Sequence, residues 1–200
     1  MASTKVMENA VSLLKQFLDR LSPRQHNAYL ISDTHFSEDD LRICCHRPFD
    51  DISEMDTTIA DNWNATIKKD DTIYFLGDWG KNRWYWRKYL NGKKLSVKGN
   101  HDHGTRAPCT RILKTSNHKY LLVHDPYYGR HYHGWVIHGH HHNNFPKKYP
   151  FINGFNKTIN VSAEVIGYKP VSLEAIEALD LSTIEWMQTA YSTPTRFTNL

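Results

Sequence analysis

Short runs of apolar residues, each followed at once by polar side chains, recur along the first half of the chain. Residues 27–32, 72–76 and 94–98 form three such runs, and each is too short for a helix, so we predict three buried strands. Between the first two, a capping pattern at Ser53 and apolar residues at four-residue spacing as far as Ile67 predict a helix. This order is typical of an open α/β sheet, which binds ligands at the carboxyl ends of its strands.

The second half of the chain is richer in strand patterns. Residues 109–114 and 120–123 flank a polar turn and predict an antiparallel hairpin. A serine followed by an acidic first turn predicts a last helix over 172–179. The remaining expected elements are two strands and the loop between them: 135–138, 158–161 and 143–157.

The length and the ends of the chain indicate one domain with short additions. Two hundred residues fit a single domain. Helical spacing of apolar positions predicts an amphipathic helix over 7–21, inside an N-terminal helical extension of residues 1–24. We expect the domain proper to cover 25–182 and a poorly anchored tail to cover 183–200. No apolar run approaches the roughly 18 residues that a membrane helix requires, so no membrane partner is expected.

The composition changes this picture little, except for histidine. The chain is 40% hydrophobic and 23% charged, and its formal charge of +4 permits an anionic substrate without requiring nucleic acid. Three cysteines do not make a disulfide framework, and the charged N-terminal stretch is not a secretory signal, so a cytoplasmic location is expected. Histidine numbers 13, and its positions beside predicted strands favour metal-ligand or acid–base roles.

Polar side chains that can bind metal ions follow five of the predicted strands. The most concentrated set is the run Val97–Asp102, in which a glycine precedes Asn, His and Asp. The other motifs are Asp33-Thr34-His35, Gly77-Asp78, His124 and Gly139-His140-His141-His142. Hydrolysis of a phosphate ester needs a nucleophile near neutral pH and neutralisation of phosphoryl charge, which two divalent cations about 3.5–4 Å apart supply. Asp and neutral His ligands, with a neutral oxygen allowed, suit such a pair. We therefore predict one dinuclear site that hydrolyses phosphate esters.

In this order the five motifs resemble those of the calcineurin-like metallophosphoesterase superfamily. The resemblance covers roughly residues 27–180, and the stretches ISDTHF, LNGKKLSVKGNHD and NVSAEVIGYKPVSLEAI also resemble a small bacterial and phage branch of predicted phosphoesterases. It implies an α/β fold, a two-sheet sandwich with αββα layers. It also implies metal-dependent hydrolysis by direct attack of a metal-bridging hydroxide, with no covalent phosphoenzyme.

The resemblance further implies a role for each motif residue. Asp33, His35 and His142 would hold one metal ion, Asn100, His124 and His140 the other, and Asp78 would bridge them. His101 would protonate the leaving oxygen or stabilise the phosphoryl charge, and Asp102 would hydrogen-bond His101 to fix its tautomer. Of the metals that suit these ligands we expect Mn²⁺ first, with Fe, Ni²⁺, Zn²⁺ and Mg²⁺ as further candidates.

Side-chain direction supports part of this assignment from the residues themselves. In a strand-end loop, residues i and i+2 can point the same way, which pairs Asp33 with His35 and His140 with His142. Taken singly, each of these residues has an ordinary alternative, such as a helix cap, a satisfied core histidine or a solvated loop position. The ordered set of five motifs makes a coincidence of such alternatives improbable.

Four further residues bear on the substrate. Trp79 directly follows Asp78, and Tyr127 and Tyr128 come just after His124, so all three are expected to line the cleft. Arg47 could clamp a phosphate or could anchor its own loop. An aromatic rim and the absence of a large cap domain favour phosphodiester hydrolysis of a small nucleotide or cyclic phosphate.

Three alternatives stay open. The basic and aromatic segment 79–89 has the composition of a single-strand nucleic-acid surface, which would fit a nuclease or end-processing enzyme. For most of this segment we expect instead a helix with its Trp and Tyr side chains in the core. A phosphomonoesterase is the second alternative. The third, a non-catalytic metal-binding scaffold, is disfavoured because every motif is intact.

Overall fold

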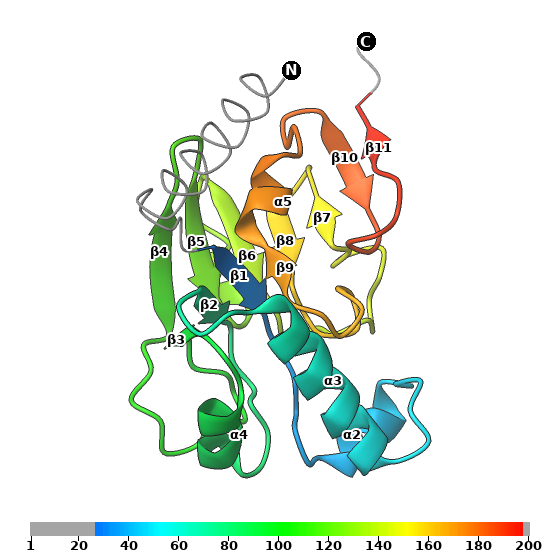
Figure 1. The fold of residues 1–200 in the computed structure, drawn as a ribbon. Helices are drawn as coiled ribbons and strands as arrows, with labels where there is room; N and C mark the ends of the chain where they lie inside the picture. Colours follow the sequence, from blue (N-terminus) through cyan, green and yellow to red (C-terminus); the bar gives the residue numbers. More distant parts are fainter. Residues whose placement is uncertain (1–26, 198–200) are drawn as a thin grey trace, which may run out of the picture.

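Two β-sheets form the framework of the protein (Figure 1). The computed structural model describes residues 27–197, and the expected N-terminal extension of residues 1–24, with its helix, lies outside them. The first sheet has the order β3 (Lys93–Ser96), β2 (Thr72–Phe75), β1 (Ala28–Ile31) and β9 (Val171–Ser172). The second has the order β11 (Thr195–Arg196), β10 (Ile184–Met187), β7 (Ile152–Asn153), β8 (Thr158–Asn160), β6 (Trp135–His138), β5 (Lys119–Val123) and β4 (Thr110–Lys114).

The centre of each sheet is parallel, so several strands end at the same edge. β1, β2 and β3 run parallel, and so do β5, β6 and β8. The two sheets are joined just beyond β1 and β8, where the backbone N–H of Ser32 donates to the carbonyl of Val161 at 2.9 Å. The expected two-sheet α/β architecture is confirmed, and its parallel strands deliver the loops that follow them to one side of the molecule.

Helices follow the strands of the first sheet. α2 (Asp39–Cys44) and α3 (Ile52–Thr66) lie between β1 and β2, α4 (Arg83–Tyr89) lies between β2 and β3, and α5 (Leu173–Glu177) follows β9. The cap of α3 is Asp51 rather than Ser53, because the Asp51 carboxylate accepts the N–H of Glu54 at 2.8 Å. The four-residue spacing nevertheless predicted the buried face correctly, since Met55, Ile59 and Trp63 are fully buried. Ser172 caps α5 as expected.

The C-terminal segment is part of the second sheet. We expected a poorly anchored tail from residue 183, and this expectation is wrong, because β10 pairs with β7 and β11 pairs with β10. Ile184 is fully buried, and Met187 is 5% exposed. β10 has only four residues, and the Thr-, Ser- and Pro-containing stretch that follows it is typical of a loop, which explains why the pattern gave no strand here.

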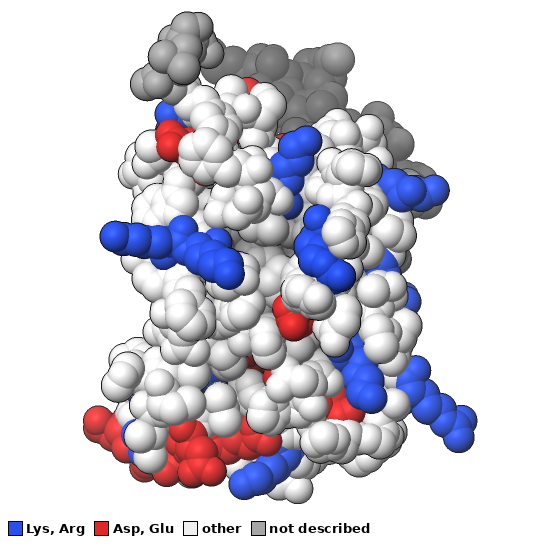
Figure 2. All heavy atoms as spheres, turned by 180° about the vertical axis from the view of Figure 1, so that it is seen from behind, with Lys and Arg blue, Asp and Glu red and all other residues white. Residues whose placement is uncertain are grey.

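Charge is distributed unevenly over the surface. α2 begins with Asp39 and Asp40. In Figure 2 the acidic side chains gather at the lower edge of the molecule, the end where α2 lies in Figure 1, and lysines and arginines are spread over the rest of that face. A polyanion would therefore be repelled from the α2 end. No helix in the described part of the chain is both long enough and apolar enough to cross a membrane.

Candidate metal centre

Loops that follow β1, β2, β5 and β6 are tied to one another by their backbones. The N–H of Asp33 donates to the carbonyl of Gly77 at 2.9 Å, and the N–H of Gly139 donates to the carbonyl of His124 at 3.0 Å. The Asp33 carboxylate also accepts the N–H of His140 at 3.0 Å. The loops that carry four of the five sequence motifs therefore form one hydrogen-bonded unit.

The backbone of these loops is strained at most of the predicted metal ligands. Five of the seven predicted metal ligands have positive φ angles, namely Asp33 (58°), His35 (48°), Asp78 (61°), His140 (73°) and His142 (49°). A residue with a side chain in this region costs about 1 kcal/mol or more, and such residues cluster at functional sites. The loops thus hold these side chains in directions that an unstrained backbone would not give them.

Asp33, His35 and His142 form a buried cluster. One ligand atom from each lies within 4.8 Å of the others. The Nδ1 of His35 is 2.5 Å from a carboxylate oxygen of Glu38, and the Nδ1 of His142 is 2.9 Å from Glu164. Each ring therefore donates from Nδ1, and its Nε2 is the nitrogen left to face the other members of the cluster. The Nε2 of His35 is buried without a hydrogen-bond partner among the described residues.

Asp78, His124, Asn100 and His140 form a second cluster beside the first. The Nδ1 of His124 donates to the carbonyl of Leu76 at 2.8 Å, so its Nε2 faces the Oδ1 of Asn100 at 2.8 Å. The same Asn100 oxygen lies 3.0 Å from the Nδ1 of His140. The Oδ2 of Asp78 is 3.1 Å from the Nε2 of His124 and, in the first cluster, 3.7 Å from that of His35. The structure thus brings all seven predicted ligands together, with Asp78 between the two groups.

The electrostatics of the site show an excess of buried negative charge. Burial alone would raise the pKa of the Asp33 carboxyl, but His142, His124 and His35 outweigh burial and hold that pKa well below its usual range. Burial disfavours the charged form of His142, but Asp33 and Glu164 raise its pKa to about 11. The pKa of His124 is raised to about 9 by Asp78 and Asp33, again against burial. The carboxylates thus require positive charge next to them, which protons or metal cations can supply.

Asp102 has a different role from the one expected. We predicted a hydrogen bond to the His101 ring, but the Asp102 carboxylate accepts the backbone N–H groups of Gly99 (3.0 Å), Asp78 (2.9 Å) and Trp79 (3.1 Å). It therefore ties the loop after β2 to the loop after β3. Gly99 makes this approach achievable, because a Cβ there would lie 2.0 Å from the Asp78 carboxylate.

His101 lies at the open side of the site. Its backbone N–H donates to the Oδ1 of Asp78 at 2.9 Å, which fixes the position of the residue. Its ring meets the ring of His35 edge-on, with 5.3 Å between centroids. The side chain is exposed, so it can meet a ligand that enters from solvent.

Arg47 is an anchor and not a phosphate clamp. Its guanidinium is buried, pairs with the Glu164 carboxylate at 2.7 Å and donates to the carbonyls of Asp33 (2.7 Å) and Thr34 (2.8 Å). Of the two roles left open by the sequence, the structure supports the anchor. Arg47 holds both the strained loop after β1 and the carboxylate that orients His142.

Replacing Arg47 with methionine is expected to lower the free energy of unfolding by about 3–5 kcal/mol, because Glu164 would lose its buried cation. Urea denaturation in a chelator measures this change without any contribution from metal. The exposed Arg130 offers a matched control, and Arg130→Met should cost less than about 1 kcal/mol. Equal losses in the two variants would contradict the anchoring role.

The aromatic rim differs from the expected one. Trp79 is 2% exposed and stacks on Phe75 with 3.7 Å between ring centroids, so it belongs to the core and does not line the metal cleft. The cleft beside the second cluster is a cavity of about 510 Å³, and its walls include Asn100, His124, His140, Lys98 and Tyr128. Tyr127 packs under Arg130 and is not among the residues that line this cavity. Of the two tyrosines expected at the cleft, Tyr128 lines it and Tyr127 does not.

Two important residues were missed. Glu38 and Glu164 orient the rings of His35 and His142, and neither was predicted. Glu38 had a usable signal, since it lies three residues after His35. Glu164 had none, because 22 positions separate it from His142 and its neighbours are apolar.

Comparison with known proteins finds similar proteins both by sequence and by structure. No protein-family model matches it. It is 43% identical over 160 residues to the uncharacterized protein MJ1445 of Methanocaldococcus jannaschii, a match that covers 76% of this chain and 89% of that protein. The crystal structure of AQ665, a protein of unknown function from Aquifex aeolicus, superposes with a TM-score of 0.62 at 25% identity, covering 77% of this chain and 99% of that one. The E. coli phosphoesterase YfcE matches with a TM-score of 0.35 at 15% identity, over 68% of this chain and 78% of its own.

Proposed function

We propose that the chain is a calcineurin-like metallophosphoesterase, a metal-dependent phosphohydrolase that prefers phosphodiesters. One observation supports this proposal most strongly. Three histidines, His35, His124 and His142, each have Nδ1 on an acceptor and Nε2 directed among buried carboxylates. That is how proteins orient histidine ligands toward a metal ion.

The two clusters of the candidate metal centre fit two divalent cations. Asp33, His35 and His142 would hold one, Asn100, His124 and His140 the other, and Asp78 would be shared. This set of carboxylate, imidazole and amide ligands suits Mn²⁺ as well as Fe, Ni²⁺, Zn²⁺ and Mg²⁺. When bound, such ions would neutralise phosphoryl charge and lower the pKa of a coordinated water.

The remaining residues of the site would position and protonate the substrate. His101 is exposed beside His35, with its backbone fixed by Asp78, so its ring can reach a leaving oxygen. Tyr128 and Lys98 flank the cleft and would contact the group on the far side of the phosphate. We propose that the substrate is a small nucleotide or a cyclic phosphate.

An assay with two aryl phosphates tests the proposal. With Mn²⁺ present, we expect hydrolysis of bis(p-nitrophenyl) phosphate about tenfold or more faster in kcat/KM than hydrolysis of p-nitrophenyl phosphate, and no turnover of either in excess chelator. Calorimetric titration of the chelated protein with Mn²⁺ serves as an independent readout of metal binding. Metal binding without turnover of either ester would instead favour the non-catalytic scaffold, and a preference for the monoester would favour a phosphomonoesterase.

A nuclease is the second candidate, and one observation favours it. Aromatic side chains of α4 lie on the surface, where Trp84 is 74% exposed. We expected most of these side chains in the core. Exposed aromatic rings among basic residues are typical of proteins that bind single strands.

A further inference from the structure

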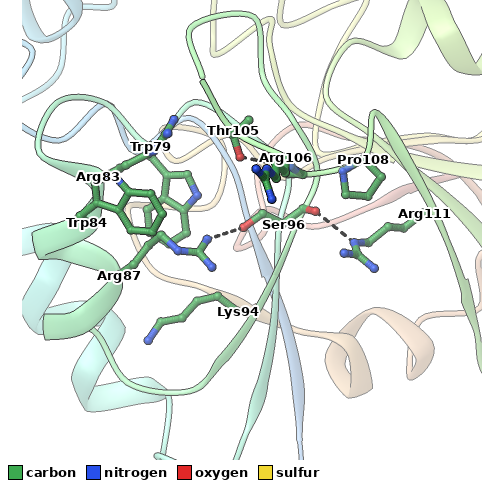
Figure 3. Close-up of a pocket in the computed structure, with 11 residues that line it drawn as sticks. Trp79, Arg83, Trp84, Arg87, Lys94, Ser96, Thr105, Arg106, Pro108 and Arg111 are labelled. Carbon is green, nitrogen blue, oxygen red and sulfur yellow. Dashed lines mark hydrogen bonds between the residues drawn. The ribbon is translucent and has the colours of Figure 1, made fainter. Parts of the chain in front are cut away.

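A second cavity lies on the other side of the loop that carries His101, and it is strongly basic. Its volume is about 270 Å³. Five of its lining residues are cationic, and none of the described residues that line it is Asp or Glu: Arg83, Arg87, Lys94, Arg106 and Arg111 (Figure 3). The basic pocket therefore holds five cationic side chains and, among the described residues that line it, no acidic one.

The cations of the basic pocket are held by neutral groups. Arg87 donates to the hydroxyl of Ser96 at 2.9 Å, and Arg111 donates to the carbonyl of the same serine at 3.0 Å (Figure 3). Arg83 donates to the carbonyls of His103 and Gly104. Among the described residues no carboxylate forms a salt bridge with any of the three. These bonds fix the guanidinium groups in place, and their positive charge is available to a bound anion.

The charges in the basic pocket repel one another. Burial, and next the charge of Arg83, lower the pKa of Arg87, and burial followed by the charge of Arg87 lowers the pKa of Lys94. An anion in the cavity would relieve this repulsion. An anionic ligand with several oxygens would therefore suit this cluster of cations.

An aromatic face continues from the basic pocket along α4. Trp84 lines the pocket, and the Arg83 guanidinium lies over its ring at 5.4 Å. Tyr85 is 58% exposed and stacks in parallel with Tyr89. Only Trp86, among the aromatic residues of α4, packs inward, against Phe36. Flat exposed rings next to clustered cations offer a surface for bases and for phosphates at once.

The basic pocket and the metal centre share one loop. Residues 98–100 and 109–110 line the metal cleft, whereas residues 105–108 line the basic pocket. The N–H of Lys98 donates to the carbonyl of Pro108 at 2.9 Å and closes the loop at its base. A chain-like ligand could cross this loop and occupy both cavities.

We propose that the basic pocket and the exposed rings of α4 bind single-stranded nucleic acid, with backbone phosphates in the pocket and a base on Trp84. One part of this proposal rests on the proposed function: the substrate of the metal centre would be a nucleic-acid strand that extends from that centre into the basic pocket. A single phosphate would not use five cations and would leave the rings of α4 bare. A duplex would hide its bases from Trp84.

Fluorescence anisotropy of a labelled oligothymidylate of about 12 nucleotides tests the proposal. The binding is measured in a chelator, so its result does not depend on any hydrolytic activity. We expect binding that weakens with salt between about 50 and 200 mM. Trp84→Ala should weaken it about tenfold, as the loss of one stacked base implies. Arg106→Glu should weaken it and make the salt dependence less steep.

Matched controls separate the pocket from general charge and from surface aromatics. Lys88 is exposed on the same helix but does not line the pocket, so Lys88→Glu should weaken binding by less than about threefold. Tyr191 is 69% exposed and belongs to neither surface, so Tyr191→Ala should have no effect. The proposal would be overturned by an absence of oligonucleotide binding, by equal losses in Lys88→Glu and Arg106→Glu, or by a duplex binding as well as the single strand. Oligonucleotide binding without hydrolysis would count against the proposed function alone.

Discussion

Replacing Asp78 with asparagine is expected to abolish hydrolysis almost completely. The Oδ2 of Asp78 lies 3.7 Å from the Nε2 of His35 and 3.1 Å from that of His124, so it faces both clusters. Asparagine keeps the size of the side chain and can keep the acceptor for the N–H of His101, but it removes the negative charge that two adjacent cations would share. Loss of several kcal/mol of charge stabilisation corresponds to a fall in kcat on the order of 10³-fold.

The same variant should also bind less metal. Metal content after dialysis against Mn²⁺ should fall by about one ion per chain, and the stabilisation that Mn²⁺ gives against urea should shrink accordingly. Asp61→Asn is the matched control, because Asp61 is exposed on α3 and lies in neither cluster. If Asp78→Asn bound two ions and turned over normally, Asp78 would not be the shared ligand.

The candidate site was predictable because its residues follow strands in a fixed order. Asp33, Asp78 and His124 come directly after short apolar runs, and parallel strands place such positions at one edge. The pairing of Asp33 with His35 was also correct, although the reason was incomplete. Both residues have positive φ angles, so the strained loop, and not ordinary strand alternation, directs their side chains.

The residues that support the site were beyond the reach of the sequence patterns. Asp102 follows His101 directly, which suggested a contact, but its carboxylate turns back to three backbone N–H groups. Glu164 and Arg47 form a buried pair 117 positions apart, and a contact at that separation leaves no mark on local periodicity. Local patterns therefore found the groups that face the cleft and missed those that hold them.

The aromatic residues of α4 show a different limit. The helix has 7 residues, four of them aromatic, and one helical face cannot bury all of them. Trp86 takes the inward position, which leaves Trp84, Tyr85 and Tyr89 outside. Counting the positions on each face would have predicted surface rings. Trp79 lies before the helix, so the crowding of its faces does not apply to this residue, and it is buried in the core.

Replacing His101 with alanine is expected to reduce turnover by about 10²–10⁴-fold while metal binding stays within about threefold of the native value. The metal ligands should remain in place, because the bond to Asp78 comes from the backbone N–H of residue 101, which alanine retains. The ring is lost, and with it the group proposed to protonate the leaving oxygen. Calorimetry with Mn²⁺ and steady-state kinetics on the same sample measure the two effects.

The leaving group decides whether His101 acts as an acid. p-Nitrophenolate departs without a proton, whereas a nucleoside or alkyl alkoxide needs one, so His101→Ala should slow esters with alkyl leaving groups far more than aryl esters. His103→Ala is the control, because His103 is exposed two positions later and its contact with Arg83 uses only the backbone carbonyl. An equal loss on both classes of ester would mean that His101 stabilises phosphoryl charge. Unchanged turnover on both would show that it takes no part in the reaction.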